Sequence, residues 1–130
     1  MQNVTKYSFM EQERPVLKAS ITGKEGNVAL RGTIYGYELP NGIYLQGDIY
    51  GLLKSSDFAF HVHEGLLCDK HGEKILILPD IMSDADGIAS AQIYLDRSNT
   101  TRIAGRPIVL HLKEDGKETE IACGLLSRVL

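Results

Sequence analysis

The sequence predicts an all-β fold, in which antiparallel strands form a sandwich or a flattened barrel. Short runs rich in β-branched and aromatic residues are separated by Gly, Asn and Pro, which is typical of strands joined by turns. No segment keeps a helical spacing of apolar residues over the length of about 11 residues that a helix needs. At 130 residues, the chain has the length of one domain.

The first half of the chain predicts three strands. Val16–Ile21 is the first, and it ends at Thr22-Gly23. Asn27–Tyr37 is the second, because it alternates in part and contains β-branched and aromatic residues. Leu39-Pro40-Asn41-Gly42 predicts a hairpin, since Asn-Gly accepts the positive φ angles of a tight turn. The partner strand then returns over Ile43–Leu53.

The second half predicts four more strands around one long connection. Asp57–His63 alternates with a period of two, as a half-buried strand does. Further strands are expected over Ile88–Leu95, Pro107–Leu112 and Thr119–Leu126. Glu64–Gly87 is expected to be an irregular loop, and a loop of that length in a compact domain is usually functional. About seven short strands with regular turns favour a sandwich or barrel.

Composition narrows the classes of function. A formal net charge of −3 gives no basic patch for nucleic acid. No stretch reaches the roughly 20 apolar residues that span a membrane. Residues 1–14 are expected to form a flexible tail before a domain over 15–130, and they lack the apolar core of a secretory signal. The sequence as written therefore predicts a cytoplasmic protein, or a secreted or surface-exposed one if a leader precedes it.

Cys68 and Cys123 are the two cysteines. A lone pair suits a single disulfide, although such a bond is uncommon in a reducing cytosol. Two buried thiols that pack as small apolar residues explain the same count. The residues alone leave both alternatives open.

The four histidines suggest a metal site. His61 and His63 are two apart on a predicted strand, so their side chains project from one face at roughly 6–7 Å along the chain. His71 follows in the long loop, and His111 lies in a later strand. Imidazole ligands suit copper, zinc, iron and nickel, and the spacing does not choose among these metals. Four scattered histidines without a shared ion remain the alternative.

Several motifs, in order along residues 15–126, resemble the Cu/Zn superoxide dismutase family. Phe60–Gly65 (FHVHEG) resembles the copper-binding strand of that family. Leu78–Ile81 and Asp84–Gly87 resemble the segment after its zinc loop. Ala104–His111 resembles the strand that ends in the last copper histidine, and Ile121–Leu126 resembles the C-terminal strand with its disulfide cysteine. The resemblance implies a Greek-key antiparallel β-sandwich, in agreement with the strand pattern.

The resemblance also implies the site residues. His61, His63 and His111 match three copper ligands, and His71 takes the place of the histidine that bridges two metals. One copper ion per chain is expected at these four histidines, with His71 as the fourth ligand and with His71 and His111 as catalytic residues. Cys68 and Cys123 match the disulfide of the family and favour the bonded alternative.

Three departures from the family pattern are visible. Lys74 and Ile77 stand where zinc ligands are expected, and no histidine is left over, so zinc is expected to be absent. A short hairpin over 112–119 replaces the long charged loop that guides the anion. Glu120 stands in place of an arginine beside the copper, where it should repel superoxide, and Lys113 or Arg128 is a candidate replacement. These losses resemble the copper-only branch of the family.

The leading hypothesis is therefore copper-dependent dismutation of superoxide. The alternatives are a copper-binding protein that stores or delivers the ion without turnover, and a structural domain without metal. The expected partners are superoxide or a copper donor, with no nucleic acid and no membrane. The sequence leaves the oligomeric state open, with a homodimer as one alternative. A carboxylate usually orients a metal-bound imidazole, and Glu73, Asp80 and Glu120 are the candidates.

Overall fold

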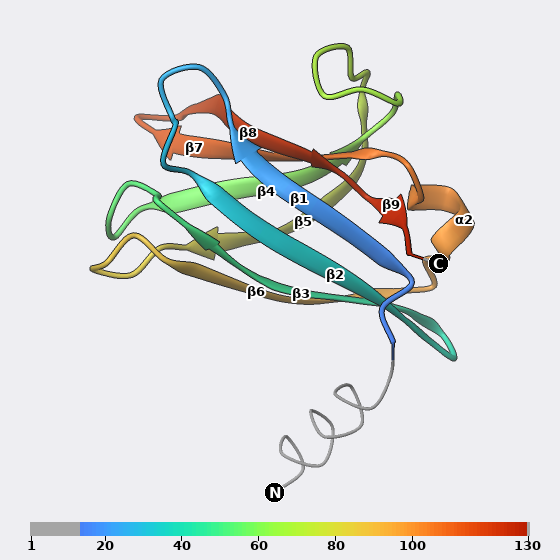
Figure 1. Ribbon diagram of the computed structural model, residues 1–130. Helices are drawn as coiled ribbons and strands as arrows, with labels where there is room; N and C mark the ends of the chain where they lie inside the picture. The colour runs from blue at the N-terminus through green and yellow to red at the C-terminus, as the bar shows by residue number, and fades with distance from the viewer. Residues whose placement is uncertain (1–13, 130) are drawn as a thin grey trace, which may run out of the picture.

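The computed structural model describes residues 14–129, so most of the expected tail over 1–14 lies outside the described residues. In this part of the chain, nine strands form one antiparallel sheet that curls into a flattened barrel (Figure 1). The expected all-β fold is confirmed. The strands are β1 (Leu17–Gly23), β2 (Arg31–Leu39), β3 (Gly42–Tyr50), β4 (Asp57–His63), β5 (Lys74–Met82), β6 (Ala89–Asp96), β7 (Pro107–Glu114), β8 (Lys117–Leu125) and β9 (Ser127–Arg128).

The sheet folds into two layers. The strand order is β5-β4-β7-β8-β1-β2-β3-β6, with β9 added beside β1. One layer contains β5, β4, β7 and β8, and the other contains β1, β2, β3 and β6 (Figure 1). The neighbours β4–β7 and β3–β6 are distant in sequence, which gives the connections of a Greek key. Strands β5 and β6, the two ends of the path, also lie in contact.

The core lies between the two layers and is built by alternation along the strands. In β1, Leu17, Ala19 and Ile21 are buried, while the residues between them are exposed. In β4, Phe58, Phe60 and Val62 belong to the buried core cluster. Because successive side chains of a strand point to opposite faces, the histidines of β4 project from the other side of the layer.

Two expectations about local structure are wrong. The expected loop over 64–87 contains β5, which is an edge strand paired only with β4 along the path. The second strand begins at Arg31 and not at Asn27, because residues 24–30 form turns in which Asn27 N donates to Lys24 O and Leu30 N to Asn27 O. A short helix, α2 (Thr100–Ile103), was also not expected. The hairpin at Pro40-Asn41 joins β2 and β3 as expected.

Candidate metal centre

Three histidines from two neighbouring strands meet on the outer side of the first layer. His61 and His63 come from β4, and His111 comes from β7, where it pairs with Ala59 of β4. One ligand atom from each ring can be chosen so that all three lie within 4.8 Å of one another. The rings are buried, with 3%, 6% and 9% exposure for His61, His63 and His111. Three imidazoles at these distances are close enough to bind one metal ion.

Irregularities in the sheet lie beside two of the three rings. The β4–β5 register shifts between Val62 and His63, and the β7–β8 register shifts between Leu110 and His111. A bulge leaves one residue unpaired and bends the strand locally, which re-aims the neighbouring side chain. The ring centroids of His61 and His111 are 4.9 Å apart, whereas those of His63 and His111 are 6.0 Å apart.

The hydrogen bonds of the cluster leave one nitrogen of each ring available to bind a metal ion. The His63 Nδ1–H donates to the carbonyl oxygen of Gly72 at 2.8 Å, which leaves the Nε2 of His63 with a lone pair. His61 Nδ1, His63 Nε2 and His111 Nδ1 are buried and have no hydrogen-bond partner among the described residues. Buried polar atoms are nearly always paired, so three unpaired nitrogens in one cluster fit a site for a cation.

The surroundings hold the imidazoles in the neutral form that binds metals. Burial, with a smaller contribution from the nearby charge of Lys74, lowers the pKa of His61 to about 4. Burial also lowers the pKa of His111, against the opposing effect of Glu120. Both rings are therefore neutral at neutral pH, with one ring nitrogen free of a proton, so a metal ion would not have to compete with a proton for that nitrogen.

His71 lies beside this cluster, not within it. Its ring centroid is 4.3 Å from that of His63. The His71 Nε2–H donates to Glu120 Oε1 at 2.7 Å, and Glu120 also forms an ion pair with Lys24. Burial raises the pKa of Glu120, but the hydrogen bonds from Lys24 and His71 outweigh that effect, so its pKa lies below the ordinary value. The glutamate is thus an anion with two partners.

The other candidate carboxylates lie elsewhere. Asp80 accepts from Lys113 Nζ at 2.6 Å, which ties β5 to β7 and occupies that lysine. The backbone oxygen of Glu73 accepts from Glu64 N, and this bond closes the loop at its base. Arg128 pairs with Leu17 at the opposite end of β1 from Lys24. Of the three candidates, Glu120 is the one whose carboxylate accepts a hydrogen bond from a histidine among the described residues.

An ion pair that the sequence did not suggest extends across the histidine cluster. Lys74 of β5 and Glu118 of β8 stand on either side of β4 and β7, the two strands that carry the cluster. Their Nζ and Oε1 atoms are 4.0 Å apart. Lys74 is the register partner of His63, so its side chain projects on the histidine side. Both charges lie close enough to affect the pKa of His61 and of His111.

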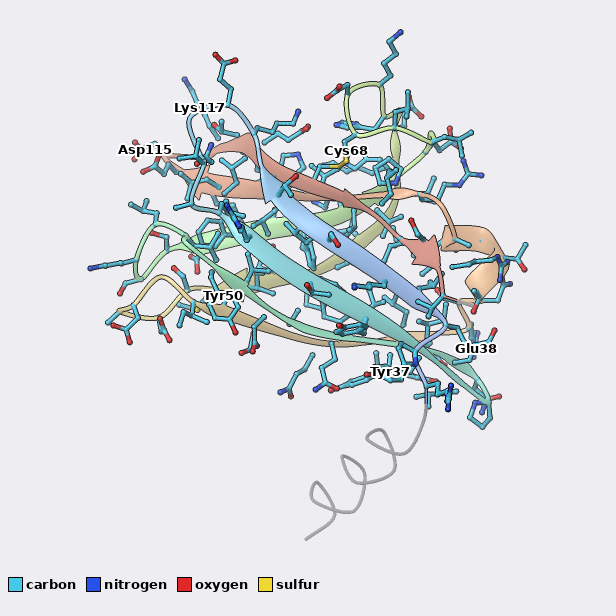
Figure 2. The ribbon with its side chains drawn as sticks, viewed as in Figure 1. Tyr37, Glu38, Tyr50, Cys68, Asp115 and Lys117 are labelled. Carbon is cyan, nitrogen blue, oxygen red and sulfur yellow. A yellow bond between two sulfur atoms is a disulfide. The ribbon has the colours of Figure 1, made fainter. Side chains whose placement is uncertain are left out.

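A disulfide anchors the loop that carries His71. Cys68 and Cys123 are bonded, with their Cα atoms 5.9 Å apart, and this bond joins the 64–73 loop to β8 (Figure 2). Within the loop, Gly72 N donates to Glu64 O at 2.7 Å. The loop is therefore fixed at its base and at Cys68, which restricts the positions that His71 can take.

The fold and the site define an all-β barrel with a histidine cluster able to hold a metal ion. Among the described residues, no helix is long and apolar enough to cross a membrane. No family model matches this chain. A stretch of 66 residues is 33% identical to an adenylate dimethylallyltransferase of Agrobacterium fabrum, strain C58. The match covers 45% of this chain and 28% of that enzyme. A match of that extent does not carry an activity to this chain.

Proposed function

We propose that the chain holds one copper ion at His61, His63 and His111 and dismutates superoxide. The proposal rests on one observation above the others: three buried imidazoles lie close together, and each has one ring nitrogen without a hydrogen-bond partner among the described residues. The donor set is all nitrogen, and imidazole is a good ligand for copper. The resemblance of the flanking motifs to superoxide dismutases supports copper over the other metals.

The reaction has a simple balance. Two superoxide ions and two protons give one molecule of oxygen and one of hydrogen peroxide. Copper would supply the redox chemistry by taking an electron from one superoxide and returning it to the next. The Gly72 carbonyl fixes the His63 ring with its proton on Nδ1 and leaves Nε2 free, and burial keeps the His61 ring neutral. Fixed ligands lower the reorganisation that each electron transfer requires.

We propose that His71 delivers a proton to the peroxide product. Its Nε2 holds a proton toward Glu120, and its ring lies against His63 at the edge of the site. An imidazole exchanges protons readily near neutral pH. Glu120 orients this ring as a carboxylate orients an imidazole in many metal sites. Whether His71 also serves as a fourth ligand is decided by the titration below.

Each of the two glutamates near the site has a lysine partner. Lys24 pairs with Glu120, and Lys74 lies across the cluster with Glu118. We propose that Lys74 attracts the superoxide anion in the role that the family assigns to an arginine. An exposed amine close to a binding site raises the local concentration of a small anion and the rate at which the anion reaches the site.

A copper titration with a superoxide assay tests the proposal. The metal-free protein is titrated with Cu(II) and followed by electron paramagnetic resonance, and dismutation is measured on the loaded protein against free copper at the same concentration. We expect one ion per chain, a nitrogen-rich signal and turnover faster than that of free copper. His111→Gln should abolish stoichiometric binding, while His71→Gln should keep binding and lower turnover.

The same experiment separates the alternatives. Stoichiometric, His111-dependent binding with turnover no better than that of free copper would identify a protein that stores or delivers copper. A loss of one nitrogen from the signal in His71→Gln would assign His71 as a fourth ligand. Absence of stoichiometric binding by the folded protein would leave the structural domain as the function.

A further inference from the structure

The tyrosines of the described chain are all on one surface. Five of the six tyrosines lie in the described residues, and they come from β2, β3 and β6. Within these strands the buried residues Ile34, Leu45 and Ile93 point into the core, so the tyrosines alternate with them on the outer face. This tyrosine face belongs to the layer that does not carry the histidines. Its members are Tyr35, Tyr37, Tyr44, Tyr50 and Tyr94, of which Tyr44 is buried, with 3% exposure.

Strand pairing aligns these rings. Tyr37 of β2 is the register partner of Tyr44 of β3, and Tyr44 is the partner of Tyr94 of β6. Tyr50 lies at the other end of β3, where it is paired with Arg31. Six residues along a strand therefore separate the two ends of the face, a distance of about 20 Å. The face is long enough for several rings of a linear polymer.

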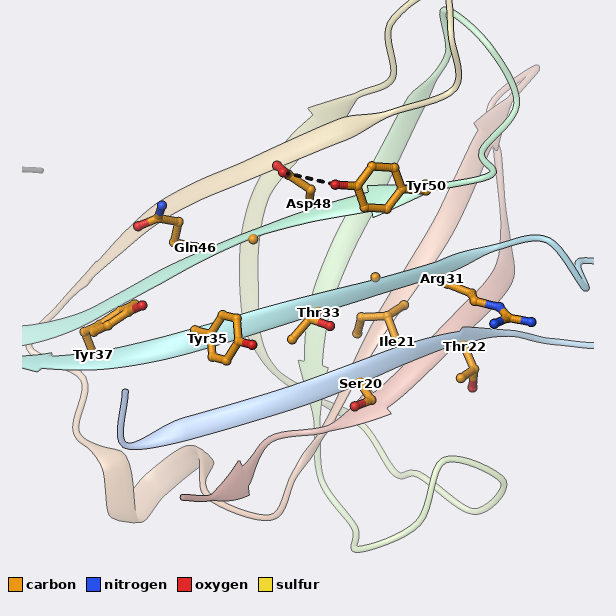
Figure 3. Close-up of a pocket in the computed structure, with 12 residues that line it drawn as sticks. Ser20, Ile21, Thr22, Arg31, Thr33, Tyr35, Tyr37, Gln46, Asp48 and Tyr50 are labelled. Carbon is orange, nitrogen blue, oxygen red and sulfur yellow. Dashed lines mark hydrogen bonds between the residues drawn. The ribbon is translucent and has the colours of Figure 1, made fainter. Parts of the chain in front are cut away.

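A groove runs along this face over β1, β2 and β3. Its volume is about 700 Å³, within the usual range of ligand sites. Figure 3 shows Tyr35, Tyr37 and Tyr50 along the groove, with the side chains of Gln46 and Asp48 between them. Tyr50 is 48% exposed, so much of its ring is available to a ligand. Aromatic faces and polar groups thus alternate along the groove.

Hydrogen bonds hold some of the polar groups of the groove in place. Ser90 Oγ donates to Asp48 Oδ1 at 2.7 Å, and Tyr50 OH lies 3.5 Å from Asp48 Oδ2. Lys18 Nζ lies 6.0 Å from the centre of the Tyr35 ring, at the edge of the groove. The Asp48 carboxylate is therefore oriented, and an ionised carboxylate accepts further hydrogen bonds through its remaining lone pairs.

The charge balance of the face argues for an uncharged ligand. Lys18 and Arg31 are matched by Asp48 and by Asp96, which accepts from Tyr94 OH at 3.4 Å. A nucleic acid or an anionic membrane requires an excess of Lys and Arg on the binding surface. A hydrophobic partner requires a continuous apolar patch, and here hydroxyl, amide and charged groups interrupt the rings.

We propose that this groove binds a neutral polysaccharide, a linear chain of pyranose rings with equatorial substituents. Such rings have flat faces of C–H groups that pack against the tyrosine rings, and their edges carry hydroxyl groups. Those hydroxyls donate to Asp48 and exchange hydrogen bonds with Gln46, while Arg31 donates to their oxygens. The site is separate from the histidine cluster, so it stands independently of the proposed copper function and would attach the protein to a glycan surface.

Affinity electrophoresis tests this inference. The full chain is run in native gels that contain hydroxyethyl cellulose, laminarin or glycol chitin, and its mobility is compared with that in gels without polymer. We expect at least one of these three polymers to retard the protein. Tyr35→Ala and Tyr50→Ala should each weaken that retardation about tenfold, because each removes a stacking ring. Tyr35→Phe keeps the ring and should bind within about twofold of the wild type.

A matched control uses an exposed apolar residue away from the groove. Leu66 is 69% exposed in the loop after β4, so Leu66→Ala should leave the retardation unchanged. Circular dichroism verifies that each variant is folded. Retardation by none of the three polymers overturns the proposal, as does equal retardation of the wild type and the folded Tyr35→Ala and Tyr50→Ala variants. If these two variants instead convert a dimer to a monomer in sedimentation velocity without any retardation, the face is a contact between copies of this chain.

Discussion

The protonation of His61 links the histidine cluster to the stability of the metal-free fold. Its pKa falls from 6.5 to about 4 because the folded chain buries the ring. Between these two pH values the unfolded chain binds more protons than the folded chain, so the free energy of unfolding rises with pH in this window. The contribution is complete above the ordinary imidazole pKa and is lost as the pH falls toward about 4.

Urea denaturation of the metal-free protein at several pH values across that window provides the measurement. The midpoint should fall as the pH is lowered, and it should fall less steeply in a folded His61→Gln variant, which has no imidazole to protonate. The same steepness in both proteins would contradict the assignment of the effect to His61.

The ion pair between Lys74 and Glu118 predicts that the rate of dismutation depends on the charges of these two residues. If the proposed function holds, Lys74→Gln should lower the dismutation kcat/KM at low ionic strength by about threefold, because the amine proposed to attract superoxide is removed. Glu118→Gln should raise it, since the amine is then released from its partner. Added salt should reduce both differences, because it screens charges near the surface. Stopped-flow measurement of superoxide decay at low and high salt tests this prediction. Equal rates for the wild type and both variants would exclude Lys74 as a guide.

At the level of elements, the close approach of neighbouring strands in the second layer predicts how glycine substitutions change the free energy of unfolding. Gly47 lies inside β3, and a Cβ there would stand 1.9 Å from the backbone oxygen of Thr33 in β2. Gly47→Ala should therefore destabilise the fold by about 3 kcal/mol or more, since backbone must move. Gly116 has a φ of +76° in the β7–β8 turn with open space around it, so Gly116→Ala should cost only about 1–2 kcal/mol. Thermal unfolding of the two variants gives the comparison.

Elements with strong local signals could be predicted from the sequence. The alternation of Asp57–His63 gives the bounds of β4 as the structure has them, and Asn41-Gly42 locates the β2–β3 turn. Strand β5 was missed because it lies at the edge of the sheet and contains Pro79, whose missing N–H only an edge or an irregular pairing tolerates. Asn27 lies in turns although a run of strand-forming residues follows, since its backbone hydrogen bonds are local.

The candidate site was predictable only in part for a similar reason. Residues two apart on one strand share a face, so the convergence of His61 and His63 follows from local geometry. The hydrogen bond from His71 to Glu120 joins residues 49 apart, and the bond from His63 to Gly72 depends on the path of a loop. Bulges beside His63 and His111 also leave no simple pattern in the sequence. Such features arise from tertiary packing.

At the scale of the whole molecule, we expect the disulfide to contribute a large share of the free energy of unfolding. The Cys68–Cys123 bond closes a chain separation of 55 residues, so its loss should cost on the order of 4 kcal/mol on the chain-entropy model. The Cys68→Ser, Cys123→Ser double variant should unfold at a lower urea concentration than the wild type, and reduction of the wild type should give a similar loss. A double variant as stable as the oxidised wild type would show that packing alone holds the 64–73 loop.

The contact between β5 and β6 affects how the barrel meets other chains. These strands end the hydrogen-bonded path, so each has a row of backbone groups that a foreign strand could pair with. Since the two strands lie against each other, each hinders access to the other's free row. Lys74, Pro79 and Asp80 on β5 disfavour strand addition further, through charge and through a missing N–H. Although β5 and β6 are not hydrogen-bonded to each other, the barrel thereby resists the edge-to-edge strand addition that leads to fibrils.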